Sequence, residues 1–600
     1  MAYRDGWQQL ARSRRAWHLA TLVALGSLVL AGRLFQLQVL GVREYTLQSQ
    51  RNRIRIEKIT APRGLILDRA GHVLADSRPS YTVRAIPRRL LGDSARLGLL
   101  SRLLDVPPED IVSRLRQESP HLPCVICRDA SFEQVSRIAE NEEDLPGVSL
   151  DVAQVRWYPQ GPVGAHLLGH VGEISPHEVE AMADQGYKSG DFLGRMGIER
   201  AYEKDLRGVD GERWLEVDAM GRVVGRFAPE QTVTPKPGKT LHLYVDLGLQ
   251  AIADSCLVGR RGAVVMLDLR TGGTLVLASA PTFDPNLFAA GINATEWRVL
   301  NTDPDRPLLF RAVQATYAPG STFKMVAFIA ALEEHVIGFT QHMPAACYGG
   351  YRFGNRFYHC WDEKGHGSLA LEDALVKSCD TYFYQVGERL NVDALATRAR
   401  AAGLGSKTGI DLPQELSGLV PDSEWLNRRW GVKGWTQGTV LNHAIGQGEY
   451  LVTPIQLARY AAMFALRGKL IVPRIVESIE EPDGTRRENH LMVSGVWNVP
   501  PETMDRVREA MHQVVERGTA VVCKIPAYMP AGKTGTAENP HGKAHSWFMG
   551  YAPYDDPDVA FSVIVEAGGH GSDVAAPIAK RLLLEIAARR APPPAPEATS

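Results

Sequence analysis

The sequence predicts an α+β protein with a transmembrane N-terminal helix and two further domains. An uncharged apolar run begins at Ala16, a Gly-rich segment separates two differently patterned regions, and the second region has strands at both ends. A chain of 600 residues is long enough for more than one core. We expect an N-terminal stretch at 1–15, an anchor at 16–40, an elongated pedestal domain at 41–238, a main domain at 239–590 and a tail at 591–600.

The anchor prediction rests on charge. The run from Ala16 to Ala31 carries no charge, and the apolar pattern resumes after Arg33. This is slightly short of the roughly 20 residues that span a bilayer, but Arg33 can snorkel to the interface. Four arginines precede the run, which places the N-terminus in the cytoplasm and the bulk of the chain outside: Arg4, Arg12, Arg14 and Arg15. A cleaved signal peptide is the alternative, although no small-x-small site follows cleanly.

Composition excludes some functions. The net charge is −1, so a nucleic-acid partner is not expected. If the cell has an outer membrane, the chain beyond the anchor is periplasmic, and its cysteines lie in an oxidising compartment. The chain has 7 cysteines, an odd number, so at least one is unpaired or bound to another group.

The region between the anchor and about residue 240 is patterned as a domain that contains both strands and helices. Arg51 to Lys58 alternates apolar and basic residues like a strand. Pro62 to Asp68, followed by Gly71 and a second apolar run, predicts a hairpin. Residues 90–145 have helical apolar spacing, as in Leu97 to Leu104 and Ile111 to Leu115. A Gly-rich segment, Phe192 to Gly225, and a linker, Pro235 to Gly238, follow.

The main domain predicts an antiparallel sheet covered by helices. Leu241 to Val245 is patterned as a strand and Leu247 to Ala253 as a helix. Gly262 to Asp268 and Thr274 to Ala278 flank a Thr-Gly-Gly turn, which predicts a hairpin. The domain closes with a strand at Val559 to Val565 and a helix at Ala575 to Ala588, and the Pro-rich tail is expected to be disordered.

Ser321 is the candidate nucleophile. It follows Pro319-Gly320 and opens the helical stretch Phe323 to Leu332, where a free N–H and the helix dipole favour an oxyanion. Lys324 is three residues on, on the same helix face, and can act as a base when neutral. The helix end and a second cation, for which Lys533 is the candidate, would lower its pKa. The alternative is that Ser321 only caps the helix.

Two further strings supply partners for Ser321. The Ser378 hydroxyl can relay a proton between Lys324 and a leaving amine. Asp380 can hold Lys324 by a charged hydrogen bond, which tends to keep that amine protonated and leaves the identity of the base open. Lys533 begins a Lys-Thr-Gly string at an expected edge strand, where Gly535 permits close approach of a substrate and the Thr536 N–H can complete an oxyanion hole.

The three strings, S-x-x-K, S-x-D and K-T-G, occur in the order and at about the separations of the motifs of the penicilloyl-serine transferases. The strings Ala444 to Gly448 and Trp547 to Pro553 also match. The chain resembles the class B penicillin-binding proteins, most of all the elongation-specific penicillin-binding proteins 2. The resemblance covers nearly the whole chain except residues near 85–160 and the tail, and no second catalytic block resembles a glycosyltransferase.

The resemblance implies a serine D,D-transpeptidase on peptidoglycan stem peptides, in which Ser321 forms an acyl-enzyme and β-lactams acylate the same residue. Lys324, Ser378, Asp380 and Lys533 would be catalytic, and Thr534, Gly535 and Thr536 would bind substrate or oxyanion. Implied partners are a RodA-type membrane glycosyltransferase and elongation scaffold proteins, at the inner membrane. The alternatives are a septal transpeptidase, a D,D-carboxypeptidase or other hydrolase, and a scaffold that activates a glycosyltransferase.

A metal site is predicted beside the nucleophile. Cys347, Cys360, His366 and Cys379 follow the pattern C-x12-C-x5-H-x12-C, a closed tetrahedral set for zinc. Some penicillin-binding proteins 2 similarly hold zinc with acidic residues, a His and the Cys of this motif. Asp362 is a possible substitute ligand, and a Cys347–Cys360 disulfide with His366 on the surface is the alternative.

The remaining cysteines and histidines predict no further site. Cys124 and Cys127 lack a second pair, so a local disulfide or two thiols is expected rather than a metal. His443, His541 and His545 are expected at the surface or in loops, and His545 is near enough to the Lys533 strand to contact substrate.

Overall fold

The computed structural model describes residues 2–40, 54–117, 119–121, 123–217, 223–226, 232–539 and 542–590. Four predicted features fall wholly or partly outside these residues: the start of the strand at 51–53, the string at 218–222, His541 and the tail at 591–600. The chain forms two compact units, one of residues 1–61 with 209–236 and one of residues 62–208 with 237–600. It crosses from the first unit to the second within the predicted linker at Pro235 to Gly238.

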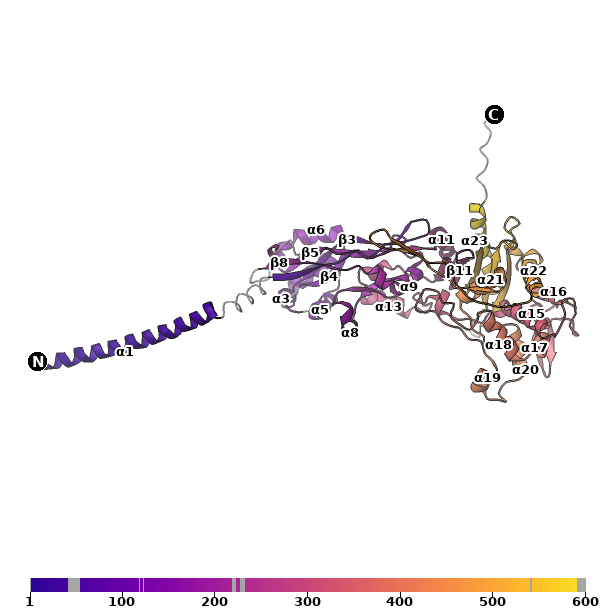
Figure 1. The fold of residues 1–600 in the computed structure, drawn as a ribbon, viewed down its shortest axis with the longest axis horizontal. Helices are drawn as coiled ribbons and strands as arrows, with labels where there is room; N and C mark the ends of the chain where they lie inside the picture. Colours follow the sequence, from indigo (N-terminus) through magenta and orange to yellow (C-terminus); the bar gives the residue numbers. More distant parts are fainter. Residues whose placement is uncertain are drawn as a thin grey trace, which may run out of the picture. The chain divides into compact units, whose positions relative to one another are not determined.

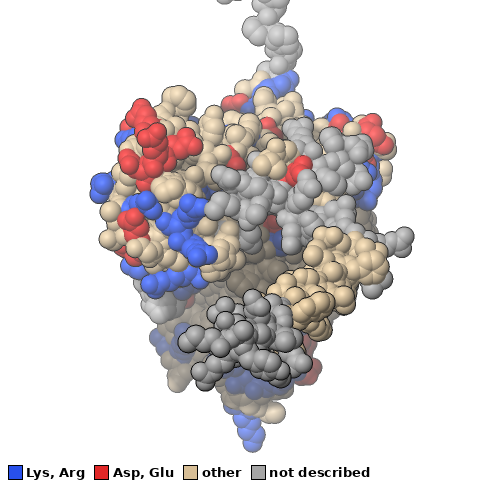
Figure 2. Space-filling model, turned by 90° about the vertical axis from the view of Figure 1, so that its left-hand side faces the viewer, with Lys and Arg blue, Asp and Glu red and all other residues tan. Residues whose placement is uncertain are grey.

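The first unit contains the expected apolar helix. Helix α1 spans Ala2–Phe35 and continues as a π-helical turn at Gln36–Leu40. Its segment Trp17–Val39 is long and apolar enough to cross a membrane, and none of its best window is buried. Figure 2 shows the described side chains of this helix as mostly tan. The unit also has a three-stranded antiparallel sheet in the order β1 (Ile54–Ile59), β8 (Gly211–Val217) and β9 (Val223–Arg226).

The pedestal part of the second unit is built on a long strand. The predicted hairpin is present: β2 (Ile66–Leu67) pairs antiparallel with β3 (Val73–Ala85). Strands β4 (Cys124–Ala130) and β5 (Val148–Trp157) also pair with β3. The helical spacing holds in α4 (Ser94–Leu104) and α5 (Pro108–Gln117), but it breaks at β4, whose alternating burial is that of a strand.

The rest of this part is short elements: α3 (Pro87–Leu90), α6 (Phe132–Glu140), α7 (Ala165–Leu168), β6 (Val171–Glu173), α8 (Pro176–Ala181), β7 (Phe192–Gly194), α9 (Gly197–Ala201) and α10 (Glu203–Leu206). A buried ion cluster connects one of these elements, α9, to two other segments. The Glu199 carboxylate, 0% exposed, accepts hydrogen bonds from Nε of Arg63 and Nε of Arg156, both at 2.6 Å. This cluster fixes α9 to the segments before β2 and at the end of β5.

The main domain contains the predicted antiparallel sheet. Its five strands run in the order β12 (Thr274–Ala280), β11 (Gly262–Asp268), β21 (Val559–Val565), β20 (His545–Ala552) and β19 (Ala531–Ala537). Successive residues of β11 face opposite ways, so Val265 and Leu267 enter one core while Val264 and Met266 enter another. The sheet is therefore covered on both faces, and β19 lies at its edge.

Helices cover the two faces of this sheet (Figure 1). Helix α21 (Pro454–Ala465) is buried along its whole length and packs on β11, β20 and β21. Helices α11 (Leu247–Cys256) and α23 (Ala575–Arg590) pack in the second core. The strand β10 (Thr240–Leu243) lies parallel to β2 and antiparallel to β16 (Val476–Glu480), so the pedestal sheet continues into the main domain.

The middle of the chain is helical, as expected. It contains α12 (Asn286–Ala289), α13 (Ala294–Thr302), α14 (Arg311–Gln314), α15 (Lys324–Glu333), α16 (Leu371–Val376), α17 (Asp380–Arg389), α18 (Val392–Ala401), α19 (Ser423–Trp430), α20 (Gln437–Ala444) and α22 (Pro501–Arg517). The remaining strands are β13 (Gly350–Phe353), β14 (Arg356–His359), β15 (Lys469–Ile471), β17 (Arg486–Glu488) and β18 (Val493–Val496).

Candidate active site

Ser321 lies in a tight turn that contacts Gly446 on one side and Thr536 of β19 on the other. It belongs to a 3-10 turn, Gly320–Phe323, that runs into α15, so one tight turn precedes the predicted α-helix. Gly320 has φ 55°, and its N–H donates to the Gly446 carbonyl at 2.9 Å. A Cβ on Gly320 would lie 2.5 Å from the Thr536 carbonyl oxygen, so only glycine fits. The turn is thereby held directly against the end of β19.

Ser378 lies at a break between helices. The sequence pattern predicts continuous helical spacing here, but α16 ends at Val376 and α17 begins at Asp380. Ser378 has φ 55°, a left-handed conformation that is uncommon for a residue with a side chain. Its N–H donates to the Leu375 carbonyl at 3.1 Å. Strained backbone of this kind is held at functional sites by its surroundings.

Lys324 contacts both oxygens of the Ser378 turn. Its Nζ, fully buried, donates to the Ser378 carbonyl oxygen at 2.7 Å and lies 3.3 Å from Ser378 Oγ. It also donates to Asp380 Oδ1 at 2.7 Å, which is the charged hydrogen bond expected from the sequence. Within the described residues Lys324 forms no hydrogen bond with Ser321. The left-handed turn therefore presents both oxygens of Ser378 to one ammonium group.

Lys533 reaches the same hydroxyl from the edge strand. Its Nζ donates to Ser378 Oγ at 2.9 Å and to the Thr534 carbonyl at 2.9 Å. Burial lowers the pKa of Lys533 well below its usual value, and the nearby charge of Lys324 lowers it further, while Asp380 opposes this. The sequence analysis treated Lys533 only as the second cation beside Lys324, so the lowered pKa of Lys533 is a feature that it did not predict.

The K-T-G strand lies against the Ser321 turn. A Cβ on Gly535 would meet Thr322 Cγ2 at 2.9 Å and the Pro319 carbonyl at 3.0 Å. Because Gly535 has no side chain, the turn that carries Ser321 can pack directly against β19. The sequence analysis predicted only that Gly535 permits close approach of a substrate. Sequence reasoning gave no role to Gln447, whose Nε2 donates to the Thr536 carbonyl at 3.0 Å. The sequence feature that points to Gln447 is the string Ala444 to Gly448, in which it lies.

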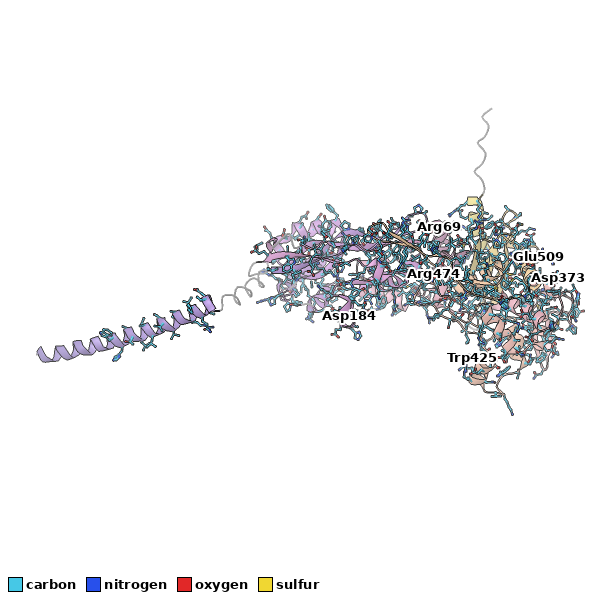
Figure 3. All side chains as sticks on the ribbon, viewed as in Figure 1. Arg69, Asp184, Asp373, Trp425, Arg474 and Glu509 are labelled. Carbon is cyan, nitrogen blue, oxygen red and sulfur yellow. The ribbon has the colours of Figure 1, made fainter. Side chains whose placement is uncertain are left out.

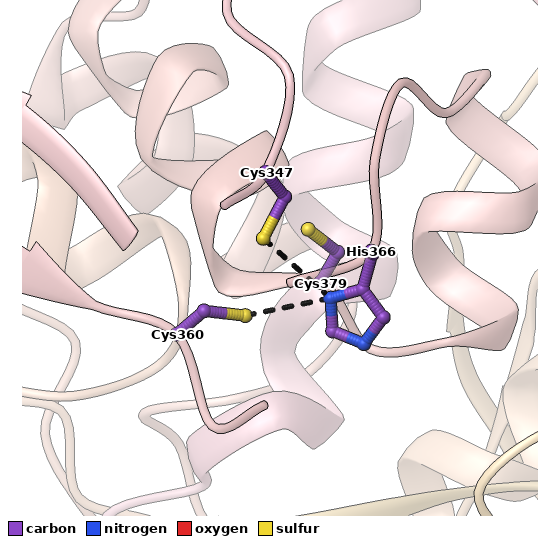
Figure 4. A group of neighbouring side chains, drawn as sticks. All are labelled: Cys347, Cys360, His366 and Cys379. Atoms are coloured by element: carbon purple, nitrogen blue, oxygen red, sulfur yellow. Dashed lines mark hydrogen bonds between the residues drawn. The ribbon is translucent and has the colours of Figure 1, made fainter. Parts of the chain in front are cut away.

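The four predicted metal ligands converge (Figure 4). The sulfur atoms of Cys347, Cys360 and Cys379 and a ring nitrogen of His366 all lie within 4.8 Å of one another. His366 Nδ1 is 3.7 Å from the Cys347 sulfur and 3.6 Å from the Cys360 sulfur. Instead of lying on the surface, the His366 side chain is only 5% exposed. No disulfide joins cysteines in the described part of the chain.

Two contacts link this cluster to its surroundings. His366 Nε2 faces Asp362 at 3.9 Å, so the carboxylate suggested as a substitute ligand lies on the far side of the ring. Trp361, next to Cys360, donates its backbone N–H to Asp380 Oδ2 at 3.0 Å. The Cys/His cluster thus borders the carboxylate that holds Lys324.

The remaining histidines differ from expectation. The prediction of a surface position for His443 is wrong: the residue is 0% exposed in α20, and its Nε2 pairs with Glu449 at 2.8 Å. It was missed because its acidic partner lies beyond a glycine turn. His545 begins β20, is half-buried, and accepts a hydrogen bond from the Ala567 N–H. Cys124 and Cys127 lie on the same strand, β4.

Comparison with known proteins agrees with this geometry. The family description "Penicillin binding protein transpeptidase domain" matches residues 262–584, and "Penicillin-binding Protein dimerisation domain" matches residues 58–243. The chain belongs to the class B penicillin-binding proteins.

Individual relatives cover most of this class B penicillin-binding protein. It is 33% identical over 581 residues to "Peptidoglycan D,D-transpeptidase MrdA" of Acinetobacter baumannii. This alignment covers 94% of this chain and 86% of that protein. It is 33% identical over 594 residues to MrdA of Escherichia coli K12, covering 92% of each. The solved complex of Penicillin-Binding Protein PBP2 with MreC from Helicobacter pylori matches with a TM-score of 0.76 and 27% identity, over 90% of this chain and 99% of that one.

Proposed function

We propose that this chain cross-links peptidoglycan stem peptides during cell-wall elongation through an acyl-Ser321 intermediate. The chain is a serine D,D-transpeptidase of the MrdA type, and a septal role is not favoured. The observation that carries the mechanism is the meeting of three motifs at one hydroxyl, since Ser378 Oγ lies 3.3 Å from Lys324 Nζ and 2.9 Å from Lys533 Nζ.

Acylation requires a proton acceptor. Ser321 Oγ attacks the carbonyl carbon of the penultimate D-Ala, and its proton passes to Lys324 in the neutral form. The carbonyl oxygen becomes an oxyanion, which the backbone N–H groups of Ser321 and Thr536 stabilise. As the C–N bond breaks, the leaving D-Ala amine takes a proton that Ser378 relays from the lysine pair.

Deacylation repeats these steps with a different nucleophile. The amine of a neighbouring stem peptide attacks the ester and gives up a proton to the lysine pair, and as the ester C–O bond breaks the Ser321 oxygen takes a proton back from that pair. β-Lactams acylate Ser321 by opening of their ring, in which the leaving nitrogen stays attached. Water as the acceptor would give the carboxypeptidase reaction instead.

A thioester analogue of the stem peptide distinguishes transfer from hydrolysis. With the full-length chain and a D-amino acid as acceptor, we expect the aminolysis product to grow with acceptor concentration at the expense of the free acid. A product ratio that does not respond to acceptor would favour the hydrolase alternative. Glycan polymerisation supported by Ser321→Ala would separate the scaffold role from the enzymatic one.

The anchor and partners extend this proposal. The helix Trp17–Val39 fits a single-pass membrane anchor. The arginines before it favour a cytoplasmic N-terminus, with the catalytic domain in the periplasm of a diderm cell. A relative is solved in complex with MreC, which supports an MreC-type scaffold as partner, and we extend the proposal to a RodA-type glycosyltransferase.

A truncation tests the anchor. Removal of residues 1–45 should release an enzyme that still binds penicillin but no longer co-purifies with a RodA-type protein. Co-purification of the truncated chain at full yield would contradict this role of the anchor.

We further propose that Cys347, Cys360, His366 and Cys379 hold a structural zinc ion. Three sulfurs and one imidazole nitrogen within 4.8 Å are a donor set that suits zinc. A second partner on His366, here Asp362, is usual for a metal-binding histidine. When bound, zinc would tie the ends of the 347–379 segment together, and Trp361 would transmit that order to Asp380 through its N–H.

Metal removal tests this. Metal analysis should find about one zinc per chain. Chelation or Cys360→Ser should lower the melting temperature and slow acylation together, because loss of a ligand frees the segment that holds Asp380. Cys256 is half-buried and lies outside the Cys/His cluster, so Cys256→Ser is the matched control. A metal-free chain with a Cys347–Cys360 disulfide and full acylation rate would overturn the proposal.

A further inference from the structure

The C-terminal end of α22 contacts both halves of the active site. The helix packs on α16, which leads into the Ser378 turn, and on β19, which carries the K-T-G string. Two ion pairs fix it to α16: Arg517 with Asp373 at 2.8 Å and Arg506 with Glu372 at 3.1 Å. Asp373 is labelled in Figure 3. The end of α22 is therefore held at a defined distance from the Ser378 turn.

Gly518, directly after α22, makes the closest of these contacts. A Cβ at this position would lie 2.5 Å from the carbonyl oxygen of Val376, the last residue of α16. Only glycine allows the two backbones to approach in this way. The next residue, Thr519, contacts the edge strand β19.

Thr519 forms a hydroxyl pair with the K-T-G motif. Its Oγ1 lies 2.6 Å from Thr534 Oγ1. Because side chains alternate along a strand, Thr534 points away from the side on which Lys533 meets Ser378. A hydroxyl has one proton and two acceptor sites. If Thr519 donates its proton to Thr534, the proton of Thr534 is left for another acceptor.

We propose that Thr519 is a positioning residue for the carboxylate of the substrate. It donates to Thr534 and so directs the Thr534 proton toward the C-terminal carboxylate of the D-Ala-D-Ala stem, or toward the carboxylate of a β-lactam. Thr519 itself does not touch the substrate. The proposal rests on the proposed function, in which the Lys533–Thr536 strand binds substrate, and deepens it by adding a residue that orients one of its donors.

The test compares an acid with its ester. The second-order rate constant for acylation of Ser321 is measured on the full-length chain with benzylpenicillin and with its methyl ester, which lacks the negative carboxylate. Thr519→Val should lower the constant for the acid about tenfold and change that for the ester by less than about twofold, since a hydrogen bond to a charged group is weakened only with the acid. Thr519→Ser, which keeps the hydroxyl, should restore the acid to near the wild-type constant.

Two further variants separate positioning from general support. Thr503→Val removes a buried hydroxyl at the other end of α22 and should leave both constants unchanged. Thr519→Val combined with Thr534→Val should be no slower with the acid than Thr534→Val alone, because the two residues act through one donor. Equal losses with acid and ester, or additive losses in the double variant, would overturn the proposal. A wild-type chain that is not acylated at Ser321 would overturn the proposed function and this proposal with it.

Discussion

Two buried charge clusters lie in the same structural unit, one in the pedestal part and one in the active site. In the pedestal, Glu199 accepts hydrogen bonds from Arg63 and Arg156, and Glu203 pairs with Arg63 at 2.6 Å, so two carboxylates face two guanidinium groups. In the active site, Lys324 and Lys533 are both fully buried, but among the described residues Asp380 is the one carboxylate that pairs with them.

The difference in balance separates structure from chemistry. Burial opposes the charged form of Glu199, yet Arg156 and Arg63 outweigh it and lower its pKa, so this buried carboxylate stays ionised. In the active site, burial and the charge of Lys324 lower the pKa of Lys533, so the two amines share fewer than two protons and Lys324 can serve as the neutral base that the proposed function requires. A buried cluster with equal numbers of carboxylates and cations holds elements together. A buried cluster with more amines than carboxylates can take up or release a proton.

The largest expected effect is on the catalytic cluster. Lys324→Arg keeps the charge but removes the neutral base, so acylation by benzylpenicillin should slow by about 10²–10⁴-fold. Arg63→Lys makes a similar exchange of cations in the pedestal and should leave the acylation constant of the folded protein unchanged. Acylation of Lys324→Arg at the wild-type rate would show that another group is the base.

The free energy of unfolding, in contrast, should depend on the pedestal cluster. Glu199→Gln leaves two buried guanidinium groups without their shared carboxylate and should lower the free energy of unfolding by about 3–5 kcal/mol. Urea denaturation measures this change, and the acylation constant of the remaining folded protein should not change. Glu203→Gln, at a more exposed carboxylate, is the milder control, and an unaltered unfolding midpoint for Glu199→Gln would contradict the structural assignment.

The smallest effect is a shift in pH dependence. The pKa of Lys533 is lowered, so this amine gains its proton as the pH falls through that pKa, and acylation should slow on acidification. Asp380 opposes the lowering, so Asp380→Asn should move the acid limb of the acylation profile to lower pH. Asp393→Asn, on α18, removes a carboxylate that accepts from Ser423 instead and should leave the limb in place. A shift to higher pH would mean that Asp380 does not stabilise the charged amine.

Local pattern was sufficient for much of the fold. The strand Val559–Val565 has the predicted bounds because every residue of it is buried and all but Ser562 are apolar. The hairpin of β11 and β12 follows from its Thr-Gly-Gly turn, in which Gly272 has φ 74°. The segment Cys124–Ala130 was read as helical because periodicity in a short, mixed run is ambiguous, and its pairing with β3 decided the outcome.

The structure brings together most of the residues that the motifs named, whereas their roles in the reaction stay predictions and their electrostatics could not be predicted from spacing. Motif spacing named Ser321, Lys324, Ser378, Asp380 and Lys533, and the structure brings the last four together. The lowered pKa of Lys533 depends on its burial and on the charges of Lys324 and Asp380 around it, which spacing does not encode. The string Ala444 to Gly448 points to Gln447, but the hydrogen bond of Gln447 to Thr536 and the hydroxyl pair of Thr519 with Thr534 form across the fold, so no local pattern identifies their partners on β19.

The most direct test of the account is the intact mass of the full-length chain before and after benzylpenicillin, followed by peptide mapping. We predict an increase equal to one bound penicillin per chain, located on Ser321, and no increase for Ser321→Ala with an unaltered melting temperature. Modification at another residue, or an unchanged mass of the wild-type chain, would contradict the assignment of Ser321 and of the charge cluster that serves it.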